Sequence, residues 1–195
     1  MSEPGADAVS PLPWRLARTS AEAHLYMDLH PCGTCATARF HPRGATVFID
    51  GELGSRFAGA CQSCGALREF VFRLPEHIVL SGDRIRYGAD RPSELIDPGE
   101  WLLVADGASA RGRVDPTGLT PQGLAAHRDL LDTAVAAMEE VLKFVPPRGD
   151  AVPDSVFFSA RGRAVYEAEP GRFGVVRLIA VLDTYREIAA RFGRD

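Results

Sequence analysis

The chain has 195 residues, which is enough for one domain of ordinary size or for a small metal module joined to a helical one. Its apolar share of 46% and charged share of 25% are those of a folded globular protein and exclude a disordered one. The formal net charge of −4 argues against broad electrostatic affinity for nucleic acid or for an anionic membrane. No stretch of sequence approaches the roughly 20 apolar residues that a membrane-spanning helix needs.

The first residues carry no targeting signal that we recognise. Residues 1–18 begin small, polar and rich in proline, and they predict a flexible tail. Residues 1–13 lack the basic start and the apolar run of a secretory signal, so we expect a cytoplasmic protein. In that compartment, two close pairs of cysteines are more typical of metal ligands than of disulfides.

Residues 19–90 predict a β-rich module that begins with one short helix. Thr19 and Glu22 have the spacing of a capping box, which starts a helix over residues 20–29. Apolar alternation and the Asp50-Gly51 turn then predict strands over residues 45–50, 56–60 and 67–74. A further pair of short strands is expected within residues 78–87.

From residue 91 to residue 195 the apolar pattern becomes helical. Asp97 before Pro98 predicts a capped helix to about residue 109, with Ile96 and Trp101 as its hydrophobic staple. A seven-residue spacing of apolar side chains predicts a long amphipathic helix over residues 121–144, and further helices are expected within residues 155–168 and 171–192. The fold class is therefore α+β, with a small antiparallel sheet packed with, or followed by, a helical body of three to four helices.

Four cysteines in two Cys-x-x-Cys pairs are the strongest chemical signal: Cys32 with Cys35, and Cys61 with Cys64. The short spacing lets both thiolates of a pair bind one ion, and the predicted hairpin between the pairs brings them together. Four thiolates fill a tetrahedral site and leave no position for water. The pattern therefore predicts one structural Zn²⁺ and no catalytic metal.

Other interpretations of the cysteines remain open at this stage. Either pair has the spacing of a thioredoxin-like redox motif, although neither lies in a strand–helix context of that kind. Disulfides and a four-sulfur iron site are the two further alternatives. His30 and His41 lie near the first pair and are candidate alternate ligands, but we interpret them as ordinary surface or supporting histidines.

Residues 30–75 resemble a zinc ribbon, in which two cysteine knuckles flank a hairpin. Gly65 follows the second pair as in a ribbon knuckle, whereas Ala36 follows the first. The chain also resembles the double-CxxCG immunity proteins, which neutralise polymorphic bacterial toxins. That resemblance rests on the paired knuckles and the chain length, and Ala36 departs from its pattern in the first pair. It implies a protein partner, and no functional residue is carried over from it.

No phosphate-binding loop, His-Glu-x-x-His sequence or nucleophile elbow is present, so we expect no enzyme activity. Adjacent helical residues do not face one site, so we interpret Glu139-Glu140 as a solvated face. His127 is expected to be a packing residue. We interpret the densest basic stretch as a surface paired with Glu167, Glu169 and Glu187; it comprises Arg161, Arg163, Arg172 and Arg177.

The leading hypothesis is a zinc-stabilised accessory factor that binds another protein, of the immunity type, with no membrane partner. The alternative is a zinc-ribbon nucleic-acid-binding or transcription-associated protein. Its support is a modest excess of arginines over acids in the ribbon, namely Arg39, Arg43, Arg56, Arg68 and Arg73. An enzyme with a pocket between ribbon and helices is a third hypothesis.

Overall fold

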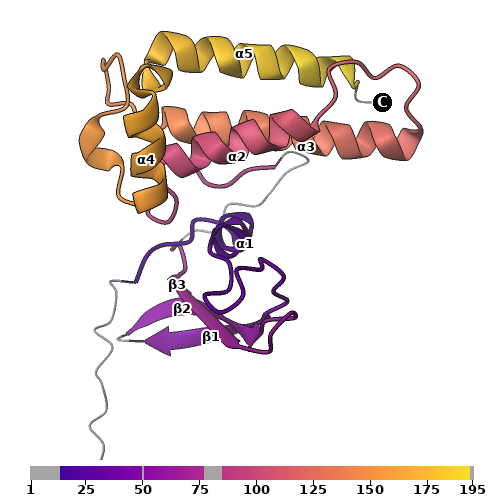
Figure 1. The fold of residues 1–195 in the computed structure, drawn as a ribbon. Coiled ribbons are helices and arrows are strands. Elements are labelled where there is room, and N and C mark those ends of the chain that lie inside the picture. Colours follow the sequence, from indigo (N-terminus) through magenta and orange to yellow (C-terminus); the bar gives the residue numbers. More distant parts are fainter. Residues whose placement is uncertain (1–13, 50, 77–84, 194–195) are drawn as a thin grey trace, which may run out of the picture.

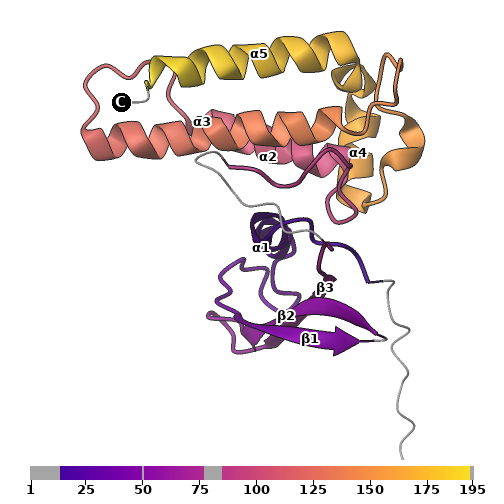
Figure 2. The ribbon, with the colours of Figure 1, turned by 180° about the vertical axis from the view of Figure 1, so that it is seen from behind.

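A computed structural model describes residues 14–49, 51–76 and 85–193 (Figure 1). Within these residues the chain forms a three-stranded antiparallel sheet and five α-helices, which confirms the predicted α+β class. The first helix lies beside the sheet, and the other four form a separate helical body above them (Figures 1 and 2). The predicted division of the chain at residue 90 stays a prediction.

Helix α1 (Ser20–Leu29) has the predicted bounds. The Thr19 hydroxyl accepts a hydrogen bond from the backbone N–H of Glu22, which is one half of the capping box. The other half is shifted by one residue, because the Glu22 carboxylate accepts from the N–H of Arg18. Tyr26 presents its ring edge-on to Phe72, with 5.6 Å between centroids, and so packs α1 onto the sheet.

The sheet has the order β1 (Arg43–Ile49), β2 (Glu52–Ala60) and β3 (Leu67–Arg73). Strands β1 and β2 are longer than predicted, because the pairing between them continues as far as Arg43, which lies opposite Ala58. Gly51 has a φ of 85° in the connecting turn, a conformation that glycine adopts at little cost. Of the further strands expected in residues 78–87, residues 77–84 lie outside the described residues and residues 85–87 form no strand.

The helical body consists of α2 (Pro98–Arg111), α3 (Pro121–Leu142), α4 (Ala160–Ala168) and α5 (Val175–Arg191). Helix α3 packs against both α2 and α5, and α4 crosses the start of α2 (Figure 1). Helix α5 starts later than predicted because residues Pro170–Phe173 form a 3₁₀ turn. No helix in the described part of the chain is long and apolar enough to cross a membrane.

Helices α2 and α4 meet at two glycines. A Cβ atom on Gly99 would overlap the backbone of Gly162, and one on Gly162 would overlap the Asp97 carboxylate. That carboxylate caps α2 by accepting from the N–H groups of Gly99 and Glu100, and it also accepts from the N–H of Ser159 before α4. The cap of one helix therefore also holds the start of the other.

A buried ionic cluster joins α1 to the helical body. Arg18 lies between Glu22 of α1, at 2.6 Å, and Glu140 of α3, at 2.8 Å. Glu140 also pairs with Lys143, and the Ser93 hydroxyl donates to Glu22. Glu140 is only 2% exposed, so the predicted solvated face for Glu139-Glu140 is wrong at Glu140. The charge is tolerated there because Arg18 and Lys143 neutralise it.

Candidate metal centre

Both cysteine pairs fold into the same tight turn. In the first, the N–H of Ala36 donates to the carbonyl of Cys32; in the second, the N–H of Gly65 donates to the carbonyl of Cys61. Ala36 has a φ of 55° and Gly65 a φ of 77°. Alanine thus takes the left-handed position that glycine holds in the second turn, at a cost of about 1 kcal/mol. The first turn therefore has the same geometry as the second, although it carries alanine where the second carries glycine.

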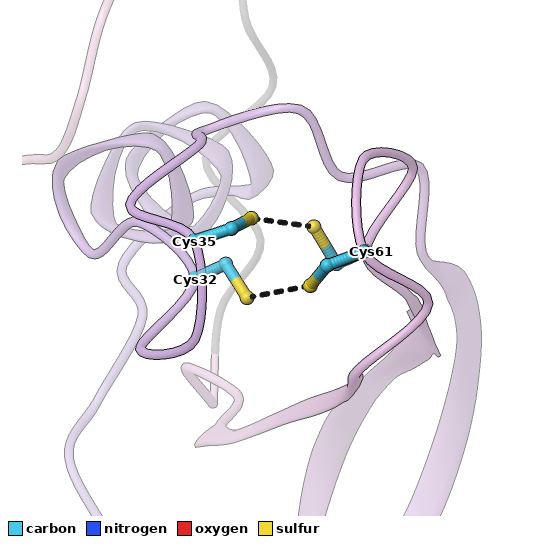
Figure 3. Close-up of side chains that lie close together, drawn as sticks. Cys32, Cys35 and Cys61 are labelled. Atoms are coloured by element: carbon cyan, nitrogen blue, oxygen red, sulfur yellow. Dashed lines mark hydrogen bonds between the residues drawn. The ribbon is translucent and has the colours of Figure 1, made fainter.

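The two turns bring all four cysteines together. Their Sγ atoms lie within 4.8 Å of one another, and the Sγ atoms of Cys32 and Cys64 and of Cys35 and Cys61 are each 3.6 Å apart (Figure 3). A disulfide would need an S–S distance of about 2.05 Å, so these pairs are free thiols. Tetrahedral coordination with Zn–S bonds of about 2.3 Å implies sulfurs about 3.8 Å apart. The donor set therefore fits a metal ion held by four thiolates.

Backbone N–H groups of the turns favour the thiolate form at the first cysteine of each pair, Cys32 and Cys61. Hydrogen bonds from Thr34 and Cys35 lower the pKa of Cys32 to about 6, and those from Cys64 and Ser63 lower the pKa of Cys61. At Cys35, burial and the other thiols outweigh the N–H of Thr37 and raise the pKa to about 12. Metal binding would displace that proton, since thiolate is the ligand form.

The two nearby histidines are used elsewhere. The His30 ring is stacked on Tyr26, and its Nδ1 lies 2.8 Å from the Tyr26 carbonyl oxygen. The His41 Nδ1 lies 2.9 Å from the side-chain amide of Gln62. Among the residues that the structure describes, the metal-binding cluster consists of the four cysteines alone.

Arg68, one of the five ribbon arginines, supports the first cysteine pair from within the fold. Its guanidinium is buried, lies 4.3 Å from the centre of the Phe40 ring, and donates to the carbonyls of Met27 and His30. These carbonyls end α1, just before Cys32. Arg68 therefore attaches β3 to the segment that carries the first knuckle. The alternation of β3 could have predicted its burial, because Arg68 lies on the same face of the strand as Phe70 and Phe72.

Three of the four arginines of the basic stretch have carboxylate partners among the described residues. Arg172 pairs with Asp106 at 2.8 Å, Arg177 with Glu169 at 2.6 Å, and Arg163 with Asp154. Of the three expected acidic partners only Glu169 takes part in the described ion pairs. His127 packs against Phe192, and its Nδ1 atom is buried without a hydrogen-bond partner among the described residues.

No protein family, curated protein or solved structure matches this chain. The interpretation of the cysteine cluster therefore rests on its own geometry: four sulfurs, two equivalent turns and distances that suit a tetrahedral ion.

Proposed function

We propose that the chain is a zinc-stabilised accessory factor that binds another protein, of the immunity type that neutralises a toxin. The observation that carries the proposal is the cluster of four thiols on two matched knuckles. Such a site suits zinc better than harder ions, and it is closed once four sulfurs are bound. Zinc there supports folding and offers no position for substrate or water.

The arginines of the ribbon support a protein partner over nucleic acid. Arg56 pairs with Glu69 at 2.7 Å, Arg73 lies near Glu52 and Glu94, and Arg68 is buried. A nucleic-acid surface needs several clustered cations that are free to contact phosphates. Three of the five arginines on which that alternative depended are engaged within the chain.

Exposed apolar side chains at the end of the sheet also suit a protein interface. Phe48 is 71% exposed and Leu53, its neighbour across β1 and β2, is 47% exposed. Leu74 lies beside them, because its N–H donates to the Leu53 carbonyl. Aromatic and aliphatic side chains gathered on a surface are typical of binding sites.

Metal analysis of protein purified under reducing conditions tests the first part of the proposal. We expect about one zinc per chain, since four thiolates bind one ion. Iron with visible absorption, or a metal-free protein of undiminished stability, would contradict it.

Two binding experiments test the second part. Cross-linking of the tagged chain in its host, followed by mass spectrometry, should identify one protein partner whose capture is lost in the Cys61→Ser variant. An anisotropy titration with DNA and RNA at about 150 mM salt should show no appreciable affinity. Sub-micromolar, salt-sensitive binding would favour the nucleic-acid alternative instead.

A further inference from the structure

A cleft of about 920 Å³ lies between the sheet and the helical body. Trp14 and Ile49 line it from the sheet side, and Phe144, Val156 and Phe158 line it from the helical side. The volume is within the usual range of ligand-binding pockets, about 300–1,000 Å³. The cysteine cluster does not contribute to its walls.

The Trp14 ring lies directly on the backbone of β2. A Cβ atom at position 54 would lie 2.8 Å from the indole and 2.9 Å from the Phe72 carbonyl oxygen, so only glycine fits beneath the ring. Trp14 is half-buried, with part of its indole against Gly54 of β2 and part lining the cleft. The ring is thus held in place as an aromatic wall.

Arg15 provides a positive charge at the same cleft. Its guanidinium lies 4.8 Å from the centre of the Phe158 ring and donates to the backbone carbonyl of Glu94 at 3.1 Å. No carboxylate among the described residues lies within salt-bridge distance of Arg15. Its neighbour Arg73, whose N–H donates to the Arg15 carbonyl, has both Glu52 and Glu94 as partners. The cleft therefore combines aromatic walls with one cation that has no anionic partner in the described part of the chain.

We propose that this cleft binds a segment of a partner polypeptide in which a large aromatic or aliphatic side chain stands next to a carboxylate. The apolar side chain enters between Trp14 and Phe158, and the carboxylate pairs with Arg15. Phe158 is 43% exposed in the free chain, so covering it provides apolar burial for the complex. The inference rests on the proposed protein-binding function and names the site and the chemistry of the partner.

Selection of random phage-displayed peptides on the full, zinc-loaded chain tests this inference. We expect the enriched peptides to share an aromatic or large aliphatic residue beside Asp or Glu. Labelled copies of these peptides should then lose about tenfold or more in affinity to the Phe158→Ala and Arg15→Gln variants. Arg113→Gln and Ile179→Ala remove the same kinds of side chain from exposed sites on the helical body, and they should bind like the parent.

Each other outcome overturns the inference. Peptides that bind Phe158→Ala as tightly as the parent would place protein binding elsewhere on the chain, and the proposed function would stand without the cleft. Enriched peptides that lack an acidic residue and bind the Arg15→Gln variant as tightly as the parent would contradict the proposed pairing of a partner carboxylate with Arg15. Failure to enrich any peptide, with saturable binding of the aromatic sulfonate probe 8-anilinonaphthalene-1-sulfonate that depends on Phe158, would assign the cleft to a small molecule. Thermal melts of each variant separate loss of binding from loss of fold.

Discussion

At the scale of single residues, the buried ionic cluster is the most consequential feature. Arg18 is 6% exposed, and Glu22 and Glu140 are almost fully buried. Burial lowers the pKa of Arg18, but the hydrogen bond and charge of Glu22 outweigh it and leave the pKa above its ordinary value. With Lys143 the cluster holds two positive and two negative charges. Loss of one member leaves a buried charge without compensation.

We predict that Glu140→Gln lowers the free energy of unfolding by about 3–5 kcal/mol, the range for a broken buried ion pair. Arg18 and Lys143 both lose a charged partner, while the shape of the side chain is kept. Denaturant unfolding followed by circular dichroism measures the change. The control is Glu139→Gln, one residue earlier and paired with Arg186 on the surface, which should cost less than about 1 kcal/mol. Equal effects would contradict the role of the cluster.

Glu100 is a buried carboxyl with the opposite consequence for stability. It is 3% exposed, and its Oε2 atom has no hydrogen-bond partner among the described residues. Burial, with a further contribution from the charge of Asp97, raises the pKa of Glu100 above its ordinary value of 4.5. The folded state therefore holds this proton more tightly than the unfolded state does. Its contribution to stability falls as the pH rises from about 4.5 through the raised pKa.

The expected result is that Glu100→Gln flattens the pH dependence of stability in that window. The difference in free energy of unfolding, variant minus parent, should become more favourable to the variant as the pH rises from about 4.5 through the raised pKa of Glu100. Denaturant melts at several pH values measure it, and taking the difference cancels the titration of the cysteines. Glu187→Gln, on the exposed side of α5, is the control and should give a constant difference. A constant difference for Glu100→Gln would contradict the raised pKa.

At the scale of elements, the crossing of α2 and α4 depends on the absence of a side chain. Gly162 sits against the Asp97 carboxylate that caps α2. The same carboxylate accepts from the N–H of Ser159, which is itself the cap residue of α4. A larger residue at position 162 must either move the carboxylate or separate the helices.

We predict that Gly162→Ala lowers the free energy of unfolding by about 3 kcal/mol, through overpacking and loss of the Asp97 cap. Alanine is normally the better helix former, so a loss here isolates the packing effect. The matched control is Gly107→Ala in α2, where nothing lies within 4 Å of the added Cβ atom. That variant should gain about 0.5–1 kcal/mol. A gain at both positions, in parallel thermal or denaturant melts, would rule out the tight crossing.

At the scale of the whole molecule, the four cysteines connect segments that are far apart in the chain. The first knuckle follows α1 directly, and the second lies between β2 and β3. Metal binding energy at such a site is largely folding energy. The buried core is one cluster that runs from Met27 and Phe72 in the module to the fully buried Trp101 and Phe173 in the helical body.

Cys61→Ser should therefore release the metal and loosen the cysteine module far more than the helical body. We expect loss of amide hydrogen-exchange protection concentrated near residues 30–75, with α3 and α5 still protected, because their contacts lie within the helical body. Ser63→Ala changes the same turn without removing a thiol and should retain both metal and protection. Protection that is unchanged in Cys61→Ser would show that the cluster does not hold the module together.

Local signals in the sequence were sufficient for most of the fold and for the cluster of four cysteines. Thr19 and Asp97 each accept from the first turn of a helix, as predicted, because a cap involves only neighbouring residues. The spacing of the cysteines was equally informative, because the two thiols of one Cys-x-x-Cys pair must lie close together in space. The strand ends at β1 and β2 were missed because pairing extends them beyond their own propensity.

Only the tertiary structure decided which residues far apart in the chain contact each other. Glu139 and Glu140 are chemically identical neighbours, yet one is on the surface and the other is buried against Arg18, 122 positions away. The cleft that contains Trp14 and Phe158 likewise exists only because distant segments face each other. Periodicity and capping depend on neighbours along the chain, whereas the burial of a particular charge depends on which surface covers it, and that is set by packing.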